Sequence, residues 1–442
     1  MLMDPNLRLD ILGAGPAGLG VGYFAKKNNI PLSIYESSNQ VGGNCKTIVK
    51  GEFRYDTGAH RFHDKNNYIT SEVKGMLGKE LAKINVPSKI YHNGNMINFP
   101  LNLSSIIKNL PAKDLIKIGC ENFLNIFALK EDPKNFKQLA YQNYGKTLSN
   151  LFLINYTEKL WGLNADVLDP SISGNRLKNL NLGSLLKQIV HSNFDSGHLD
   201  GSFYYPKHGF GKIFDKMSDY IGLENILFNS KITKLKHDGK KIKEIQYNDE
   251  KFFEPGMVIN TLPINILANL FDPSPPENIK KIIEKINFRD VRLCVLFLQL
   301  PKFSDNASIY FPEPNVPFNR IYEPKNRSKK MAPEDKTCIV VETSQSRNAL
   351  NLSDEEFFEK IELTLIKLGF LKKGDIFDYR IGLIPNAYPV LNKDIREKII
   401  TALNYFNSFE NHLMHGRNAE FEYLHTHDLL LRSKGITEKI FR

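Results

Sequence analysis

The sequence predicts an α/β protein, and three observations along its 442 residues support this prediction. A strand, a glycine-rich turn, a helix and a second strand follow one another between residues 8 and 43. A helix-rich stretch then extends to about residue 195, and apolar segments separated by turn residues follow from residue 231. A chain of this length is expected to form two or three lobes rather than one compact domain.

The composition is that of an ordinary folded chain. Hydrophobic residues make up 41% and charged residues 24%, which argues against intrinsic disorder. The net charge of +10 favours an anionic partner, such as nucleic acid, acidic lipid or a phosphorylated small molecule. The lysines are spread along the chain without a basic arm or helix, so we do not expect nucleic acid to be the partner.

The cysteines and the apolar runs bear on location. The chain has four cysteines, Cys45, Cys120, Cys294 and Cys338. They show no CxxC spacing, and they are too few to hold a chain of this size together by disulfides. No apolar run reaches about 18 residues, and the first residues lack the pattern of a secretory leader. We therefore expect a cytoplasmic protein with no transmembrane segment.

The N-terminal turn reads Gly13-Ala14-Gly15-Pro16-Ala17-Gly18 and stands between a strand and a helix candidate. In a dinucleotide-binding unit Gly13 makes the tight turn, Gly15 lets a pyrophosphate approach the backbone, and Gly18 lets the helix pack on the strand. The N–H groups at the start of the helix can then receive the phosphates.

Two later features strengthen this interpretation. A second apolar run ends at Glu36, whose carboxylate can accept a ribose hydroxyl and favours a free 2′-hydroxyl over a 2′-phosphate. Gly42-Gly43-Asn44 follows, where missing side chains let the backbone lie against a cofactor. An ordinary glycine loop would explain each segment alone, but their order favours a cofactor site.

The glutamate followed by a glycine doublet resembles the FAD-binding superfamily of amine oxidases, protoporphyrinogen oxidases and UDP-galactopyranose mutases. This resemblance implies FAD as the cofactor and a discontinuous Rossmann-like domain with a helical cap lobe and a second mixed sheet. On that pattern the FAD-binding domain comprises residues 1–90, 200–265 and 381–442. The cap occupies residues 91–199, and a substrate-side sheet lobe occupies residues 266–380.

Further FAD contacts are implied at two loops. Gly58-Ala59-His60 resembles the mutase segment that contacts the flavin near its reactive N5 atom. Gly416-Arg417 resembles the last cofactor contact of the superfamily. The spacing of His60 and His63 would suit two metal ligands, but no third ligand is near in the sequence, so no metal site is expected.

Tyr156-Thr157-Glu158-Lys159-Leu160-Trp161-Gly162 contains the only tryptophan in the chain. Trp161 offers a flat apolar wall with one hydrogen-bond donor, and a partly buried core tryptophan is the alternative. The segment resembles a mutase motif whose tryptophan lies by the substrate pocket.

Two arginines and two tyrosines complete the candidate substrate site. A guanidinium group can hold a diphosphate through two parallel bonds, although a surface arginine is the default. Arg320 begins a segment that resembles the mutase pattern Arg-Ile-x-Glu-x-Lys, whose arginine clamps the substrate diphosphate, and Arg176 is the second candidate. Tyr388 and Tyr423 match mutase tyrosines, with packing as the alternative role.

The resemblance leaves the substrate open. His425 and His427 flank a position around which the mutases are usually acidic. Residues 172–185 and 203–209 resemble protoporphyrinogen-oxidase-like and eukaryotic mutase patterns more than bacterial mutases.

The leading hypothesis is a UDP-galactopyranose-mutase-like flavoenzyme that acts on a nucleotide sugar through a reduced-flavin N5 adduct. Such an enzyme would serve polysaccharide or glycan precursor biosynthesis, with NAD(P)H as a candidate flavin reductant. The alternatives are an FAD-dependent oxidase or dehydrogenase of the amine or porphyrinogen type, and a non-catalytic FAD-binding protein.

Overall fold

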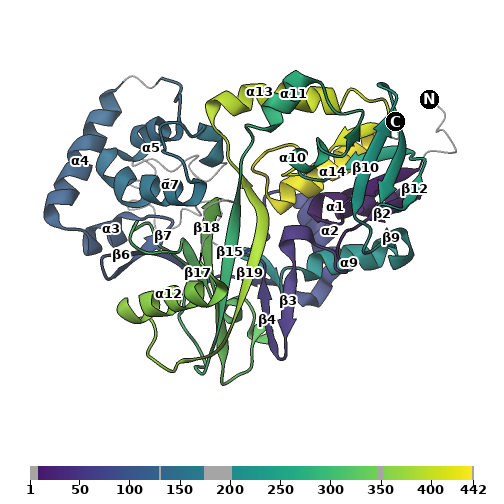
Figure 1. The fold of residues 1–442 in the computed structure, drawn as a ribbon. Coiled ribbons are helices and arrows are strands. Elements are labelled where there is room, and N and C mark those ends of the chain that lie inside the picture. Colours follow the sequence, from purple (N-terminus) through teal and green to yellow (C-terminus); the bar gives the residue numbers. More distant parts are fainter. Residues whose placement is uncertain (1–7, 129–130, 174–201, 347–351, 441–442) are drawn as a thin grey trace.

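A computed structural model describes residues 8–128, 131–173, 202–346 and 352–440 (Figure 1). A parallel sheet with its helices forms one end, a long mixed sheet crosses the middle, and a group of helices forms the other end. The predicted α/β class, with a Rossmann-like unit, a helical lobe and a second mixed sheet, is confirmed.

The parallel sheet has the strand order β20-β13-β1-β2-β9. Its five strands are β1 (Leu9–Leu12), β2 (Leu32–Tyr35), β9 (Ile226–Leu227), β13 (Met257–Asn260) and β20 (His412–Met414). Asp10 interrupts the apolar pattern of β1, but it is paired with Arg8 and accepts a 2.8 Å hydrogen bond from the Gly256 N–H. This buried carboxylate therefore has partners on the strand that carries the glycine turn.

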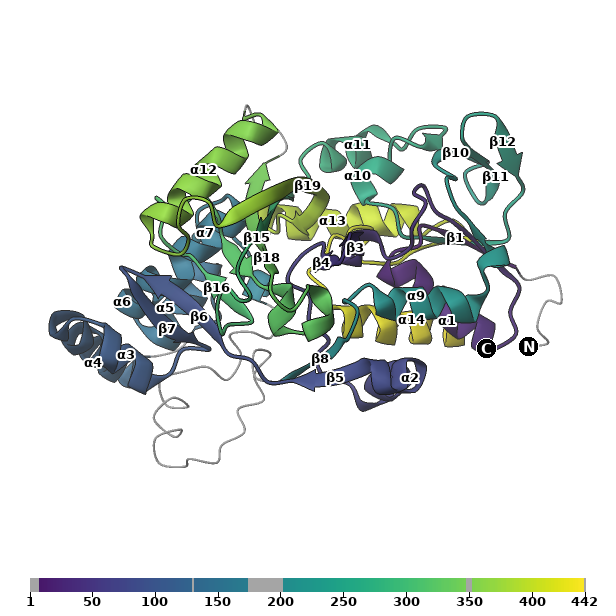
Figure 2. The same ribbon diagram turned by 90° about the horizontal axis from the view of Figure 1, so that it is seen from below.

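Helix α1 (Pro16–Lys27) begins directly after the glycine turn, with proline at the first helical position, where its fixed φ suits the helix. It packs between α9 (Lys212–Ile221) and α14 (Thr426–Ile440), as Figure 2 shows. A Cβ at Gly20 would lie 2.6 Å from the Ser433 Oγ atom, so the close approach of α14 requires glycine there. The two ends of the chain thus build one layer.

The central sheet is mixed and has the order β19-β15-β18-β17-β16-β6-β7, with β16 and β6 parallel. Its strands are β6 (Ser88–His92), β7 (Asn95–Phe99), β15 (Phe288–Leu298), β16 (Ser308–Tyr310), β17 (Arg320–Tyr322), β18 (Thr337–Ser346) and β19 (Ile376–Pro389). It uses residues 88–99 and extends to Pro389, beyond the range predicted for the sheet lobe. The division into three units remains a prediction.

Smaller elements complete the fold. The minor strands are β3 (Thr47–Lys50), β4 (Phe53–Asp56), β5 (Leu81–Ile84), β8 (Phe203–Pro206), β10 (Ile232–His237), β11 (Ile242–Tyr247), β12 (Lys251–Phe253) and β14 (Phe271–Asp272). The remaining helices are α2 (Asn67–Leu77), α3 (Leu103–Asn109), α4 (Ala112–Phe127), α5 (Phe136–Tyr144), α6 (Lys146–Leu148), α7 (Asn155–Trp161), α10 (Ile264–Leu267), α11 (Glu277–Ile283), α12 (Asp354–Lys367) and α13 (Lys393–Phe406). A π-helical turn at Ser149–Ile154 leads into α7.

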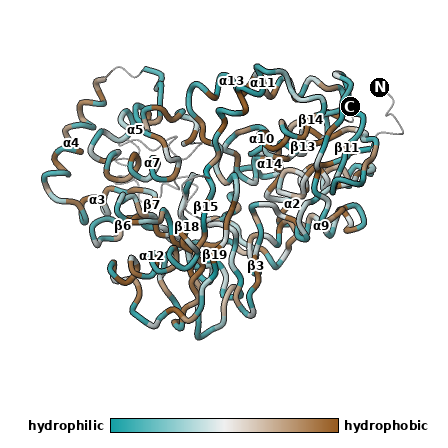
Figure 3. The backbone as a smooth tube through the Cα atoms, in the orientation of Figure 1, coloured by the Kyte–Doolittle hydropathy of each residue, from teal (hydrophilic) through white to brown (hydrophobic). Residues whose placement is uncertain are grey.

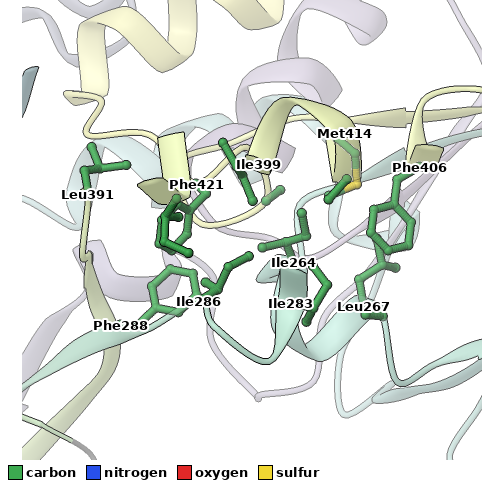
Figure 4. Packing of buried hydrophobic residues seen from close by; sticks show 14 of the residues in the cluster. Ile264, Leu267, Ile283, Ile286, Phe288, Leu391, Ile399, Phe406, Met414 and Phe421 are labelled. Atoms are coloured by element: carbon green, nitrogen blue, oxygen red, sulfur yellow. The ribbon is translucent and has the colours of Figure 1, made fainter. Parts of the chain in front are cut away.

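One apolar cluster joins the parallel sheet to the neighbouring helices (Figure 4). Phe288 at the start of β15 packs edge to face on Phe421, with ring centroids 5.0 Å apart. Ile264, Ile283 and Ile399 bring α10, α11 and α13 into the same cluster. The apolar segments of β15 and β18 run through the middle of the molecule in Figure 3. Among the described helices, none has the length and apolarity to cross a bilayer.

The glycine turn allows a first test. A Cβ at Gly18 would lie 2.0 Å from the Gly13 carbonyl oxygen, so Gly18→Ala should destabilise the protein by about 2–3 kcal/mol in urea unfolding. Gly75 in α2 has no atom within 4 Å of its Cβ position, so Gly75→Ala should stabilise by up to about 1 kcal/mol. A Gly18→Ala protein as stable as wild type would contradict this packing.

Candidate functional site

A cavity of about 470 Å³ runs between the parallel sheet and the central sheet. At one end it is lined by Glu36 and the start of α1, and at the other by Arg320 and Tyr388. A volume of this size is within the range of cofactor and ligand pockets. The cavity collects most residues predicted for the cofactor: Gly13, Gly15, Pro16, Ala17, Glu36, Gly43, Asn44, Gly58, Ala59, His60, Gly416 and Arg417.

Backbone geometry opens the cavity at the glycine turn and the glycine doublet. Gly42 and Gly43 have φ angles of 104° and 53°, in a region that favours glycine. The Gly42 N–H donates to the Ala14 carbonyl oxygen at 2.8 Å, so the doublet is fastened to the turn. A Cβ at Gly15 would point toward the Gly43 Cα at 3.8 Å. Gly18 and Gly42 thus support the cavity without lining it.

Glu36 is buried at the end of β2 and is already oriented. One carboxylate oxygen accepts from the Ala14 N–H at 2.8 Å, and the other accepts from the Ser38 N–H at 2.9 Å. These bonds hold the carboxylate at the cavity wall, where its remaining lone pairs can accept the hydroxyls of a ribose.

His60 is neutral and fixed in one orientation. Its Nε2 atom lies 2.9 Å from the Asn44 carbonyl oxygen and 3.1 Å from that of Thr57. Carbonyl oxygens only accept, so Nε2 carries the proton and Nδ1 faces the Cys45 Sγ atom at 4.0 Å. Burial lowers the pKa of His60 to about 4 and raises the pKa of the Cys45 thiol to about 12. Neither group is charged at neutral pH.

An ion pair closes the other end of the cavity. Arg320 on β17 lies opposite Glu342 on β18, and its Nε and Nη2 atoms donate to the Glu342 Oε2 atom at 2.8 Å and 2.5 Å. The second oxygen of Glu342 accepts from the Ala59 N–H at 2.8 Å. Burial lowers the pKa of Arg320, but the Glu342 carboxylate together with the nearby Tyr388, Tyr310 and Tyr156 raises it above its ordinary value. Arg320 therefore keeps its charge and its position.

The predicted substrate aromatics meet beside this pair. The Trp161 ring lies 5.6 Å from the ring of Tyr388 and 5.6 Å from that of Tyr423, both edge to face. The Arg417 guanidinium lies 4.4 Å from the centre of the Tyr423 ring and 5.1 Å from that of Tyr388. Burial raises the pKa of Tyr388 to about 12, so its hydroxyl stays protonated and can donate.

Trp161 is held in place by the charged residues of its own segment. The Glu158 carboxylate accepts from the Ala165 N–H at 2.8 Å, just beyond the end of α7. The Lys159 ammonium donates to the carbonyl oxygens of Phe311 and Glu313, both at 3.0 Å. Burial lowers the pKa of Lys159 to about 7. These contacts fix the end of α7 against the loop between β16 and β17.

A second, smaller cavity of about 110 Å³ lies behind Trp161 and is mostly apolar. It is lined by aromatic rings that include those of Phe99, Phe152, Tyr156 and Tyr310. Tyr310 also lines the larger cavity, so the two spaces share a wall near Arg320.

The structure also places residues that the sequence did not suggest. Glu342 follows the apolar run Ile339-Val340-Val341. A single carboxylate in an otherwise apolar strand could have marked it as a functional residue. Tyr310 and Asn418 gave no comparable signal. Arg176 lies outside the described residues. In the described part of the chain, no group of three or more His, Cys, Asp or Glu residues is arranged to hold a metal ion.

The fold and the cavity together define a flavoprotein, and comparison with known sequences gives its family. Residues 23–371 match the family described as flavin containing amine oxidoreductase. This match covers 349 of 442 residues, so the chain belongs to that family.

Individual relatives come from two branches. The chain is 25% identical over 219 residues to UDP-galactopyranose mutase of Mycoplasma pneumoniae, covering 48% of this chain and 52% of that protein. It is 22% identical over 296 residues to coproporphyrinogen III oxidase of Staphylococcus aureus, covering 60% of this chain and 62% of that protein. The chain thus matches about half the length of the mutase.

Solved structures extend the likeness over the whole chain. A crystal structure of reduced UDP-galactopyranose mutase superposes with a TM-score of 0.86, covering 98% of this chain and 94% of that one. The sequence identity is 19%, so this likeness shows the fold.

FAD is the cofactor, and the cavity fits it. The Arg417 Nε and Asn418 Oδ1 atoms are buried in the cavity wall without a hydrogen-bond partner among the described residues. Buried polar atoms of this kind are costly unless a ligand satisfies them. Together with the open glycine backbone and Glu36, they suit a polar dinucleotide along the cavity.

Acid should destabilise the protein through His60. Its folded pKa is about 4 and its ordinary value is 6.5, so the unfolded chain binds the proton first as the pH falls. The free energy of unfolding therefore has its full value, as far as His60 is concerned, above pH 6.5, and it falls by about 3 kcal/mol as the pH approaches 4. In His60→Gln, whose amide can still donate to the two carbonyl oxygens, urea unfolding should show a smaller loss between pH 7 and pH 4. An unchanged pH dependence would contradict the assignment.

Proposed function

We propose that this flavoenzyme acts on a nucleotide-activated sugar in the manner of a UDP-galactopyranose mutase. When bound and reduced, FAD would supply the nucleophile for the anomeric carbon. The observation that carries the proposal is the position of Arg320, which stands with Tyr388 and Tyr423 at the end of the cavity reached by Gly58, Ala59 and His60.

The charge of this end supports an anionic substrate. Arg320 and Arg417 both line it, and the carboxylates among the described lining residues are those of Glu36 and Glu342. Glu36 stands at the far end, and Glu342 is occupied by Arg320. With Arg320 and Glu342 paired, Arg417 leaves this end positive, which would repel a cationic amine and attract a diphosphate.

The surrounding residues suit the parts of a nucleotide sugar. Arg320 would hold the diphosphate as it leaves the sugar carbon, with hydroxyl donation from Tyr388 and Tyr423. The smaller aromatic cavity is suited to the flat base, because it is mostly apolar and is lined by Tyr310, whose ring centre lies 5.9 Å from the Arg320 guanidinium. Trp161 lines the smaller space and packs on Tyr388 and Tyr423, which line the larger one, so it would exclude water from that side of the reacting carbon.

An oxidase or dehydrogenase is the second candidate. It is favoured by the longer match to coproporphyrinogen III oxidase, which covers 60% of this chain. In that reaction the substrate would give a hydride to the flavin, and carboxylate groups of the substrate would be the anions near Arg320. The two candidates therefore differ in whether the flavin must be reduced before the substrate binds.

The redox state of the flavin separates them. Protein reduced anaerobically with dithionite should convert UDP-galactopyranose into an isomer of equal mass, seen as a new peak in anion-exchange chromatography. The oxidised protein is the control and should give no new peak. If reduced protein converts no UDP-sugar, while anaerobic coproporphyrinogen bleaches the oxidised flavin, the mutase proposal is wrong.

The role of Arg320 can be tested without leaving a buried carboxylate unpaired. The double variant Arg320→Met, Glu342→Gln removes both charges of the pair and keeps an acceptor for the Ala59 N–H. We expect normal FAD content and an affinity for UDP that is about tenfold to hundredfold lower, measured by the fluorescence of Trp161.

A matched control is Arg380→Met, because Arg380 is an exposed arginine on β19. This variant should bind UDP as wild type does. Equal UDP affinity in wild type and in the double variant would refute the diphosphate role of Arg320.

A further inference from the structure

Helix α4 turns large apolar side chains to the outside, unlike a usual surface helix. Such helices turn their apolar face to the core. In α4 five large apolar side chains are between 61% and 73% exposed: Ile116, Phe123, Leu124, Ile126 and Phe127. Ile116, Phe123 and Phe127 are spaced by seven and four residues, so they follow one line along the helix. Figures 1 and 3 place α4 at the outer edge of the molecule.

Hydrogen bonds on the inner face fix this orientation. The Asn122 amide donates to the Tyr144 carbonyl oxygen at 2.9 Å, and the Asn125 amide donates to that of Tyr141 at 2.9 Å. The Glu121 carboxylate accepts from both the N–H and the hydroxyl of Thr147 at 2.7 Å. Because these polar side chains of α4 are used against α5 and α6, its five large exposed apolar side chains face outward, while Ile118 is buried on the inner face.

The exposed charges on α3 and α4 have one sign, and the exposed carboxylates of Glu131 and Asp132 come only after the end of α4. The exposed charged side chains of α3 and α4 are Lys108, Lys113 and Lys117. The acidic residues of α4 do not balance them, since Asp114 is half-buried and Glu121 is bonded to Thr147. Apolar side chains flanked by lysines are typical of helices that lie in the interface of an acidic bilayer.

We propose that α4 is a docking surface for an anionic lipid bilayer. The helix would lie in the plane of the membrane, with Phe123, Leu124 and Phe127 entering the boundary between headgroups and acyl chains and the lysines reaching the lipid phosphates. Its 16 residues are fewer than the roughly 20 needed to span a bilayer, so it would rest on the surface. This proposal goes beyond the reaction and brings the enzyme to a lipid surface.

Charge complementarity favours lipid over a second copy of the chain. In a two-fold symmetric contact, the same patch would meet itself. Lys113 and Lys117 would then find no exposed carboxylate on the facing α4, whereas acidic lipids supply an anion for each. The position of α4 at the end of the molecule also leaves it open to a flat surface (Figures 1 and 2).

Vesicle sedimentation tests the proposal with the FAD-loaded protein. Wild type should sediment with vesicles of equal parts phosphatidylcholine and phosphatidylglycerol, and much less with phosphatidylcholine alone. The double variant Phe123→Ser, Phe127→Ser should have an affinity for the acidic vesicles that is lower by a factor of about ten or more. Lys113→Gln and Lys117→Gln should each weaken binding about fivefold.

The matched control is Phe252→Ser, since Phe252 on β12 is similarly exposed at 68% but has no place in this surface. It should bind the acidic vesicles as wild type does, with FAD content unchanged in every variant. Failure of wild type to bind acidic vesicles, or equal binding by Phe123→Ser, Phe127→Ser, would overturn the proposal. Loss of a dimer in that variant with unchanged vesicle binding would assign the surface to a second copy and also overturn it.

Discussion

The Glu342 carboxylate joins the loop at Ala59 to Arg320 at one end of the functional cavity. One oxygen holds the backbone N–H of Ala59, and the other holds Arg320. A buried ion pair is costly to desolvate and persists only where hydrogen bonds satisfy both partners, as they do here. A substrate anion that binds Arg320 would take the place of the Glu342 carboxylate. The Arg320 guanidinium would then keep a negative partner throughout. Any coupling between that anion and the loop at Ala59 would be reciprocal, because Glu342 is common to both.

Features that depend on neighbouring residues were predictable from the sequence. The glycine turn, Glu36 and the glycine doublet are set by local backbone requirements, and the structure brings them to one cavity. Strand β15 and helix α12 also follow from local signals, a long apolar run in the strand and a capping box at the start of the helix. The family resemblance supplied Trp161, Tyr388 and Tyr423, which lie together although 262 residues separate the first from the last.

Features that depend on pairing between distant segments were not predictable. Glu342 is important because the register of β17 and β18 sets it opposite Arg320, and a strand pattern does not contain its partner's register. The hairpin of β6 and β7 joins the central sheet through β16, more than 200 residues away. The outward apolar face of α4 is another case, since periodicity indicates that a helix has two faces but not which one the rest of the protein will cover.

The order of strands in the parallel sheet has a consequence for how the protein is made. β1 lies at its centre, yet the edge strand β20 comes from residues 412–414, and α14 covers α1 from residues 426–440. On the ribosome, the glycine turn therefore emerges long before the segments that complete its surroundings. Contacts of such long sequence separation form slowly, and their apolar surfaces stay exposed in the meantime. The cofactor site can be completed only when nearly all of the chain has been synthesised, so FAD is expected to be captured late and to act as a check that both ends of the chain have met.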